Sequence, residues 1–521
     1  MEADEPFNST ALADAVLRSS DNVHFYVLSA FLRYVSPIFR DMFSLNQGLA
    51  ADENEIRDGY PVIPLQEDGE TIRCLLSVVY PYINKPSFDN TCLLIKVWKM
   101  AEKYSMDTIV RKLQKLLRNH RWMEEQPHRV FAIAVILGWD DGAETAKQTL
   151  LLWDSVPYCE EFKDISGADY CGLIEYRFRH GRNPEQPPAT ELQLPVTTLA
   201  HGEANDASVG ANDNVPADHI DSDLLGRNVQ EIPQPFQSSA NADIILRSSD
   251  TVDFHVSRSF LGLISPSFDN LFSCAEGGSQ NGQGIVRVTD HSEALHQFLL
   301  MLYHRIDEPL TENTGLIADI CVAARKYDVP AIEARLKKQL ATTSSLIKNP
   351  LCVYAIGMSL GWVDVAKAAA KNILNAPLEE VVTCIPELQR ITGADLHHLV
   401  DYRAECVDAA CGVINNSQMH REHGPGCIAS KLRRFDPGRR YGLSSQNVVG
   451  EKRSNDVEDD LVASPRGSTY VNIFSHLLDE FDSPEHQHQY WSVPSVIGFI
   501  KCCRDVAKAI EEEIERVDIS S

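Results

Sequence analysis

The pattern of apolar and polar residues predicts a β-hairpin at two places in the chain. Residues 15–17 and 23–27 carry β-branched and aromatic side chains on either side of the polar stretch SSDN. Such a pattern predicts two short strands joined by a turn. The same arrangement surrounds SSDT near Asp250. Apolar residues with helical spacing follow each hairpin. In the first copy, Ser36 and Pro37 interrupt this spacing and suit the N-cap and the first residue of a new helix. Two short helices are therefore predicted there.

A third strand is predicted at residues 61–65, and only helices are predicted after it. Apolar residues recur three or four positions apart in residues 72–80, 93–104 and 109–117, which is the period of an amphipathic helix. A small sheet flanked by helices and followed by a helical tail belongs to the α+β class.

This pattern occurs twice because the chain is an internal duplication. The stretch DAVLRSSDNVHFYVLSAFLRYVSPIFRDMF from Asp14 matches DIILRSSDTVDFHVSRSFLGLISPSFDNLF from Asp243 at 15 of 30 positions. Farther on, PHRVFAIAVILGW matches PLCVYAIGMSLGW, and ISGADYCGLIEYR matches ITGADLHHLVDYR. The two copies are therefore expected to share one fold. The residues expected in the core are Phe25, Phe31, Phe39 and Phe43 and their counterparts Phe254, Phe260, Phe268 and Phe272.

The duplication and the changes in composition together predict the domain boundaries. Between the copies, residues 183–238 are rich in Pro, Asn, Asp and Ala and strongly acidic, a composition that favours disorder. The predicted segments are an N-terminal tail 1–13, a first α+β domain 14–120, helical extension 121–182, disordered acidic linker 183–238, second α+β domain 239–343, helical extension 344–414, largely disordered tail 415–490 and C-terminal amphipathic helix 491–521.

The motifs of each copy resemble a known interaction domain. D-x-x-L-x-S-x-D-x-V-x-F, followed by F-L-x-x-x-S-P-x-F-x-x-x-F, a strand and helices, resembles the BTB (POZ) fold. Both copies contain the sequences SSD, SP and LGW, and in this the chain resembles the BTB proteins that are abundant in mushroom-forming fungi. Residues 127–182 and 350–414 resemble the helical extensions that follow BTB domains in larger families. The resemblance implies a tandem BTB protein that binds other proteins.

The departures from the family pattern bear on how the domains pair. Many BTB domains carry a His-Lys pair where this chain has Leu28-Ser29 and Ser257-Arg258. Many also exchange an N-terminal strand in a homodimer, whereas only 13 mostly polar or small residues precede Asp14. A strand-exchanged dimer is therefore not expected, and both intramolecular BTB–BTB pairing and a homo-oligomer stay open.

Charge and cysteine usage limit the partners and the compartment. The formal net charge of −26 opposes broad nucleic-acid binding, which needs clustered Lys and Arg. The chain begins without a signal-peptide pattern and has no apolar run long enough to span a membrane. Its 13 scattered cysteines suit free thiols in the cytoplasm or nucleus. The basic run 431–440, with Lys452-Arg453 beyond it, is either a nuclear-import signal or a solvated tail.

The search for chemistry predicts no catalytic residue, no cofactor and no small-molecule substrate. The chain lacks G-x-S-x-G, G-x-x-x-x-G-K and H-E-x-x-H motifs, and the Gly-rich run 277–284 is interpreted as a connector. Cys411, His420, His423 and Cys427, with Cys406 before them, are zinc-type ligands, but their spacing fits no zinc template. Two weaker pairs are His486 with His488 and Cys502 with Cys503. We therefore expect no metal.

The remaining features concern partners. Ile500, Cys503, Ala507, Ile510, Ile514 and Val517 form a narrow apolar seam, which predicts a helix that packs on the second module or binds a partner helix. The expected function is that of a non-enzymatic scaffold or adaptor. The alternatives are a substrate adaptor of a cullin-type ubiquitin ligase, for which Cys274–Glu276 is the nearest approach to an apolar-x-Glu triplet, and a nuclear regulatory scaffold.

Overall fold

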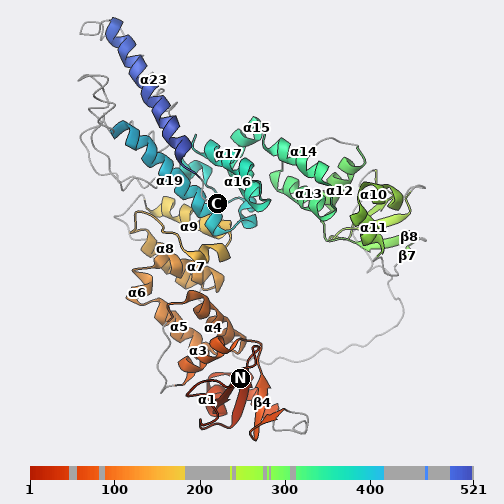
Figure 1. Cartoon of the computed structure of the whole chain (residues 1–521), viewed down its shortest axis with the longest axis vertical. Helices are drawn as coiled ribbons and strands as arrows, with labels where there is room; N and C mark the ends of the chain where they lie inside the picture. The colour runs from red at the N-terminus through yellow and green to blue at the C-terminus, as the bar shows by residue number, and fades with distance from the viewer. Residues whose placement is uncertain are drawn as a thin grey trace, which may run out of the picture. The chain divides into compact units, whose positions relative to one another are not determined.

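The computed structural model of the chain divides into two compact units (Figure 1). One unit comprises residues 1–182 and 370–521, and the other comprises residues 183–369. The described residues are 1–45, 55–80, 88–181, 235–237, 242–273, 279–280, 283–304, 313–415, 464–466 and 493–518.

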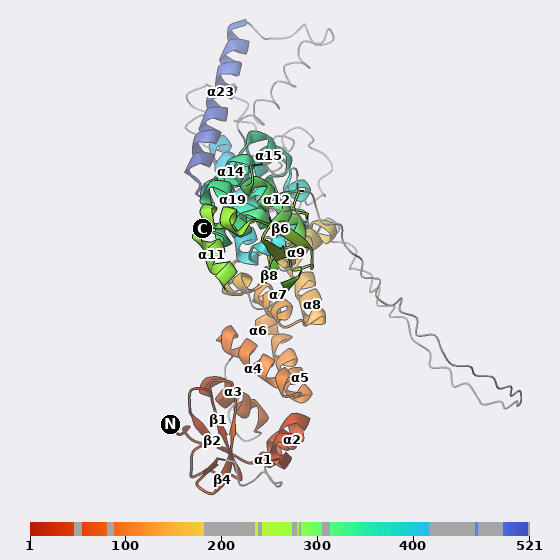
Figure 2. The ribbon, with the colours of Figure 1, turned by 90° about the vertical axis from the view of Figure 1, so that its right-hand side faces the viewer.

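The first unit begins with a small sheet and its helices (Figure 2). Its strands lie in the order β2-β1-β4-β3, with β1 antiparallel to β2 and parallel to β4. The strands are β1 Ala15–Arg18, β2 His24–Val27, β3 Ile56–Arg57 and β4 Tyr60–Pro64. The helices are α1 Ser29–Val35, α2 Pro37–Leu45, α3 Gly69–Val79, α4 Thr91–Lys103 and α5 Asp107–Leu117.

The second unit repeats this arrangement. Its sheet has the order β6-β5-β8-β7, again with one antiparallel and one parallel neighbour of the first strand. The strands are β5 Ile244–Arg247, β6 Asp253–Val256, β7 Ser279–Gln280 and β8 Gln283–Arg287. The helices are α10 Arg258–Ile264, α11 Pro266–Ser273, α12 Ser292–Leu302, α13 Thr314–Lys326 and α14 Pro330–Leu340. The shared topology confirms the prediction of one α+β fold in both copies.

The polar residues of the repeated motifs hold helix starts in place. Asp14 Oδ1 accepts a hydrogen bond from the backbone N–H of Ser29 at 2.5 Å, and Asp243 Oδ1 accepts one from Arg258 at 2.6 Å. The Asp of the SSD turn does the same for α12, since Asp250 Oδ1 accepts from Ser292 N at 2.9 Å. These carboxylates satisfy N–H groups that have no partner inside their helices.

The phenylalanines predicted for the core are mostly buried. Phe25, Phe39 and Phe43 are at most 3% exposed, as are their counterparts Phe254, Phe268 and Phe272. Phe31 and Phe260 are only half-buried. Their rings lie 4.7 Å from Tyr80 and 4.3 Å from Tyr303, respectively. The core prediction is confirmed for the first six and too strong for the last two, which sit at its edge.

Two residues of the segment that the sequence suggested to be a tail, Ala3 and Phe7, are buried. Phe7 is 2% exposed, and its carbonyl accepts a hydrogen bond from Tyr26 N at 2.9 Å. Phe236, inside the stretch expected to be linker, is 3% exposed and accepts a bond from His255 N at 2.9 Å. Each Phe therefore covers the outer edge of its hairpin, where strand backbone groups need partners. The rest of the linker, residues 183–234 and Ser238, lies outside the described residues.

Each α+β domain continues into a helical extension. The first extension contains α6 His120–Met123, α7 Pro127–Ile136, α8 Asp140–Leu150, the 3₁₀ helix η2 Glu160–Asp164 and α9 Gly167–His180. The second contains α15 Thr343–Lys348, α16 Pro350–Ser359, α17 Val363–Ile373, α18 Leu378–Val381, η3 Pro386–Arg390 and α19 Gly393–Asn415. The glycine of the repeated LGW sequence is needed for backbone conformation. Gly138 and Gly361 each follow the end of a helix, with φ of +63° and +70°, a region that glycine adopts more readily than other residues.

The C-terminal helix α23, Val493–Arg516, lies along α19 in the first unit (Figure 1). Its residues Val506, Ile510 and Ile514 are at most 3% exposed. Glu515 forms an ion pair with Lys371 at 2.7 Å. The described part of the helix therefore docks on its own chain through Ile510 and Ile514 of the predicted seam, together with Val506, which the seam did not include.

None of the helices in the described part of the chain is long and apolar enough to cross a membrane. The basic run 431–440 and Lys452-Arg453 lie outside the described residues, as do Cys274–Glu276, His486 and His488.

Candidate interaction surfaces

The two helical extensions meet in the first unit through the same short motif. Gly167 N donates a hydrogen bond to Ile391 O at 2.8 Å, and Gly393 N donates one to Ile165 O at 2.8 Å. Ser166 and Thr392 form an antiparallel bridge between these bonds. Since Ile165 and Ile391 occupy the same place in the two copies, the contact is reciprocal. It has the form of the isologous interface of a two-fold dimer, made here within one chain.

Glycine is required at the two central positions of this contact because the opposite extension approaches the backbone there too closely for a side chain. A Cβ atom on Gly167 would lie 2.8 Å from Cγ1 of Ile391 and 2.9 Å from the carbonyl oxygen of Leu388. A Cβ atom on Gly393 would lie 2.7 Å from Cγ1 of Ile165 and 3.0 Å from the carbonyl oxygen of Phe162. Any side chain would therefore push the extensions apart.

The rest of the motif caps the helices that begin there. Ser166 Oγ accepts from Asp169 N at 3.1 Å, and Asp169 Oδ2 accepts from Ser166 N at 3.1 Å. Thr392 and Asp395 form the same reciprocal pair, at 3.2 and 2.8 Å. This capping box satisfies orphan N–H groups at both helix starts. The I-[ST]-G-A-D motif thus combines a helix cap with an interface.

One end of the interface is built around a histidine. His397, on α19, is 6% exposed, and its Nε2 lies 2.9 Å from the carbonyl oxygen of Val156. The Phe162 and Tyr170 rings lie 5.5 and 5.6 Å from the imidazole. Burial lowers the pKa of His397, because a charged imidazole loses its hydration there.

A small cavity of about 20 Å³ adjoins this histidine. His397, Tyr170, Arg177 and Asp401 are among its lining residues. The volume suffices for about one water molecule and for no organic ligand. Nδ1 of His397 has no hydrogen-bond partner within the described residues.

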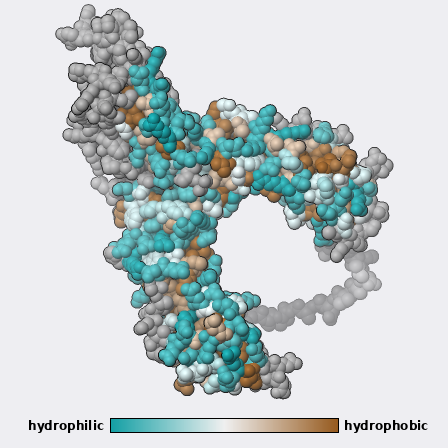
Figure 3. Space-filling view, in the orientation of Figure 1, coloured by the Kyte–Doolittle hydropathy of each residue, from teal (hydrophilic) through white to brown (hydrophobic). Residues whose placement is uncertain are grey.

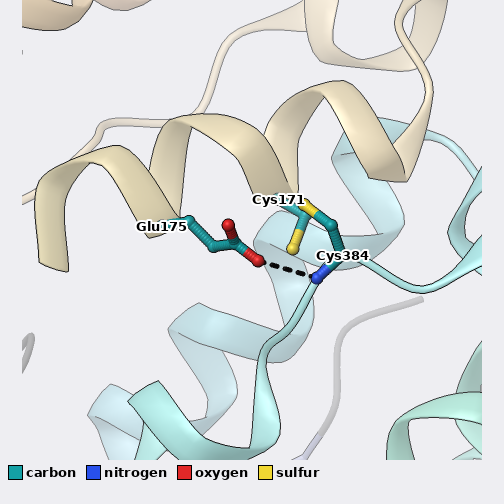
Figure 4. Close-up of side chains that lie close together, drawn as sticks. All are labelled: Cys171, Glu175 and Cys384. Atoms are coloured by element: carbon teal, nitrogen blue, oxygen red, sulfur yellow. Dashed lines mark hydrogen bonds between the residues drawn. The ribbon is translucent and has the colours of Figure 1, made fainter. Parts of the chain in front are cut away.

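The other end of the interface carries two thiols and a carboxylate (Figure 4). Cys171 and Glu175 come from α9, and Cys384 comes from the segment between α18 and η3. Their ligand atoms all lie within 4.8 Å of one another, the arrangement expected of groups that could hold a metal ion. Cys384 N donates to Glu175 Oε1 at 2.8 Å, and Arg179 pairs with Glu175 at 2.7 Å.

Burial also governs the two thiols at this end. It raises the pKa of the buried Cys171, and partial loss of hydration raises that of Cys384, with Glu175 adding to the effect at both. Cys171 is buried, whereas Cys384 is exposed. The pair is therefore protonated at neutral pH yet reachable from solvent through Cys384.

The metal ligands considered from the sequence are not brought together. Cys406 and Cys411 are buried within α19, while His420, His423 and Cys427 lie outside the described residues. Sequence reasoning missed the Cys171–Cys384 cluster because it searched for ligands close in sequence. An alignment of the two extensions could have pointed to Cys384. It precedes Ile391 by seven residues, as Tyr158 precedes Ile165, so the two residues occupy equivalent positions beside the repeated motif.

The α+β domains themselves display an apolar side chain at one repeated position. Tyr34 on α1 is 87% exposed, and Leu263 on α10 is 86% exposed. These residues match each other in the aligned copies. Phe31, Val35 and Ile38 beside Tyr34 are half-buried, so the exposed ring extends an apolar strip. Elsewhere the visible surface is mainly hydrophilic, with hydrophobic residues in separate patches (Figure 3).

Comparison with known proteins identifies both domains. The family model for the BTB/POZ domain matches residues 3–121 and again residues 233–344. The first match begins at Ala3 and the second before Phe236, so both include the segment that covers the hairpin edge. No curated protein matches the chain.

Proposed function

Because the chain is a tandem BTB protein, with one BTB/POZ domain in each copy, we propose that it is a scaffold that binds partner proteins through the exposed apolar position on the first helix of each domain. BTB domains generally mediate protein–protein interaction and scaffolding, and the domain is an interaction module and not a catalytic one. The face proposed here, called the first-helix face, comprises Phe31, Tyr34, Val35 and Ile38 in one domain and Phe260, Leu263 and Ile264 in the other.

The observation that supports this proposal is that both domains expose an apolar side chain to solvent at the same position of the fold. A single exposed apolar residue is ordinary on a protein surface. Tyr34 and Leu263, however, are exposed to nearly the same extent at equivalent positions of two copies that differ at half of the aligned residues. Different side chains at this position share only their apolar character. A binding surface would maintain that character, whereas a solvated surface would not.

The partner that fits this face best is the same face of a BTB domain in a second chain. Both copies offer an apolar residue flanked by half-buried apolar neighbours, so two such faces can pair about a two-fold axis. Arg33 and Arg258 lie over the Phe43 and Phe272 rings, at 5.3 and 5.9 Å, which draws both guanidinium groups towards the domain body. The proposed complex is therefore a homo-oligomer built from first-helix faces.

Sedimentation velocity of Tyr34→Glu and Leu263→Glu variants tests the proposal. A central apolar residue of an interface typically contributes about 2 kcal/mol or more, so each substitution should weaken self-association at least about 10-fold. Leu152→Glu is the matched control, because Leu152 is 86% exposed on a different element. A wild-type chain that stays monomeric at tens of micromolar would contradict the proposal, as would equal effects of all three variants.

Affinity purification with mass spectrometry then distinguishes the classes of further partner. Recovery of a cullin with wild type, and its loss with Tyr34→Glu or Leu263→Glu, would make the chain a ubiquitin-ligase adaptor. Recovery of chromatin proteins would make it a nuclear scaffold. Partners that bind all variants and Leu152→Glu equally would not use the first-helix face.

A further inference from the structure

We propose that Cys171, Cys384 and Glu175 bind a zinc ion that links the two helical extensions. The site goes beyond the proposed interaction function and does not depend on it. Two of its ligands come from the first copy and one from the second, so the metal would hold the copies together at one end of their interface. Glu175 and Cys384 are 209 residues apart in the sequence.

The geometry suits a tetrahedral ion. Zinc with thiolate and carboxylate ligands places its sulfur atoms about 3.8 Å apart and each sulfur about 3.6 Å from the oxygen. The three ligand atoms already lie within 4.8 Å of one another. Figure 4 shows Cys171 and Glu175 on one helix, with Cys384 beside them on a neighbouring segment. Exposure of Cys384 supplies the entry path and leaves the fourth position to a water molecule.

The carboxylate is held in place before any ion binds. Glu175 Oε1 accepts from Cys384 N at 2.8 Å, and Glu175 also pairs with Arg179 at 2.7 Å. Each carboxylate oxygen has a second lone pair for the metal. These bonds fix the ligand orientation as outer partners do in metal sites, where their loss costs 10–100-fold in affinity.

Charge also favours a divalent cation. On binding, the ion replaces one proton on each thiol, and those two protons go to solvent. Two thiolates and one carboxylate around a doubly charged ion leave one net negative charge. The Arg179 guanidinium, paired with Glu175, compensates that charge. A cysteine pair that only fills space or contacts solvent would not need the Arg179 guanidinium beside it to balance charge.

Zinc fits the pair better than a regulatory disulfide does. Disulfide formation begins with attack by a thiolate, and burial raises the pKa of both thiols, so the reactive form is scarce. A coordinated metal reverses this penalty, because a bound thiol is deprotonated by the ion itself. The same burial that slows oxidation is therefore compatible with metal binding.

A cobalt titration of the reduced, chelator-stripped full-length chain tests the proposal. Under anaerobic conditions one equivalent of Co²⁺ should produce thiolate-to-cobalt charge-transfer absorption, and one equivalent of Zn²⁺ should abolish it. Zinc binding should release about two protons per ion at neutral pH. Cys384→Ser and Cys384→Ala should each weaken zinc binding by at least about 100-fold, more than loss of an outer partner does.

Matched controls separate this site from other thiols and from the tail. Cys92 is also an exposed free cysteine, so Cys92→Ser should bind the metal as wild type does. The combined variant His420→Ala and Cys427→Ser removes tail ligands and should also bind normally. Unchanged thermal unfolding of the metal-free Cys384 variants shows that they are folded.

Three results would overturn the proposal. The first is an absence of thiolate-to-cobalt absorption at one equivalent. The second is equal metal affinity of Cys384→Ser and wild type. The third is peptide mapping that finds a Cys171–Cys384 disulfide in chain isolated without reductant in the presence of excess zinc.

Discussion

The two ends of the interface between the extensions occupy equivalent places and have different chemistry. At one end, Tyr158 lies 5.6 Å from the imidazole of His397. At the other end, the equivalent positions are Cys384 and Cys171, whose thiols approach the Glu175 carboxylate. Aromatic packing thus fills one end, and small polarisable ligands fill the other.

The centre of the same interface shows almost no difference between copies. Ile165, Gly167 and Asp169 have the same residue types at their counterparts, and the bonds from Gly167 and Gly393 have equal length. A reciprocal contact uses the same pair of positions twice, here Gly167 with Ile391 and Gly393 with Ile165, so each position is constrained in both copies. The ends touch unlike neighbours and are free to diverge. Position relative to the pseudo-two-fold axis therefore decides which residues stay alike.

The strongest test of this comparison cuts the chain between its copies. With a protease site inserted within residues 196–230, cleaved wild type should elute as one species because the central contact persists. Gly167→Val combined with Gly393→Val should make the halves separate, since neither position has room for a Cβ atom. Size-exclusion chromatography with light scattering measures the result.

The control for this experiment is Gly172→Val combined with Gly412→Val. A Cβ atom at either of these positions meets nothing within 4 Å. Separation of the cleaved control, or of cleaved wild type, would show that the central contact does not hold the copies together.

The next effect compares single glycines within one helix. Gly167→Ala should lower the free energy of unfolding by about 1–3 kcal/mol, the usual cost of overpacking. Gly172→Ala, also on α9, should raise it by about 0.5–1 kcal/mol because alanine favours the helix. Urea denaturation of both variants measures the difference. Equal stabilities would indicate that the backbone at Gly167 relaxes freely.

Acid should weaken the histidine end selectively. Burial lowers the pKa of His397, and His398 adds to this, while the Val156 carbonyl and Asp401 oppose it. Below about pH 6.5 the unfolded chain binds a proton that the folded chain does not, so stability falls as pH falls. His397→Gln should remove about 1 kcal/mol of the loss between pH 7.5 and pH 5.5.

Urea denaturation at the two pH values provides this measurement, with His398→Gln as the control. The thiols at the other end have raised pKa values and stay neutral throughout the acid range. An acid loss that His398→Gln removes as well as His397→Gln does would assign it to the wider surroundings and not to the buried ring.

The smallest effect separates packing at the two ends. Tyr158→Ala should cost about 1 kcal/mol, because its ring is 37% exposed but contacts Phe162 and two histidines. Cys384→Ala, in the presence of a chelator, should cost less than about 0.5 kcal/mol because its side chain is exposed. Thermal unfolding resolves the two. A larger cost for Cys384 would mean that its thiol stabilises the metal-free fold.

Local patterns predicted the α+β fold of both copies because many of its determinants are close in sequence. The β1–β2 hairpin and the Ser36 cap, whose Oγ accepts from Phe39 N at 3.0 Å, depend on neighbours a few residues away. Phe7 was missed because a single apolar residue in a polar stretch has no period. The repeat held a usable signal, since Pro6-Phe7 and Pro235-Phe236 align as well as the SSD turns do.

The candidate sites were beyond sequence reasoning for a different reason. The I-[ST]-G-A-D motif was recognised as a repeat landmark, yet nothing in one copy shows that its partner is the other copy. Cys171 and Cys384 become neighbours only once Gly167 and Gly393 have met. Exposure of Tyr34 likewise follows from tertiary packing, because helical spacing alone places apolar residues inside.

The reciprocal contact through Gly167 and Gly393 also affects how the protein responds to its own abundance. A homodimer with such an interface dissociates when its concentration falls below the dissociation constant. Here both halves are translated together, so each extension meets its counterpart at an effective concentration set by the connecting chain. Expression level therefore does not change this pairing, and a cell that makes few copies of the chain still has each copy fully paired.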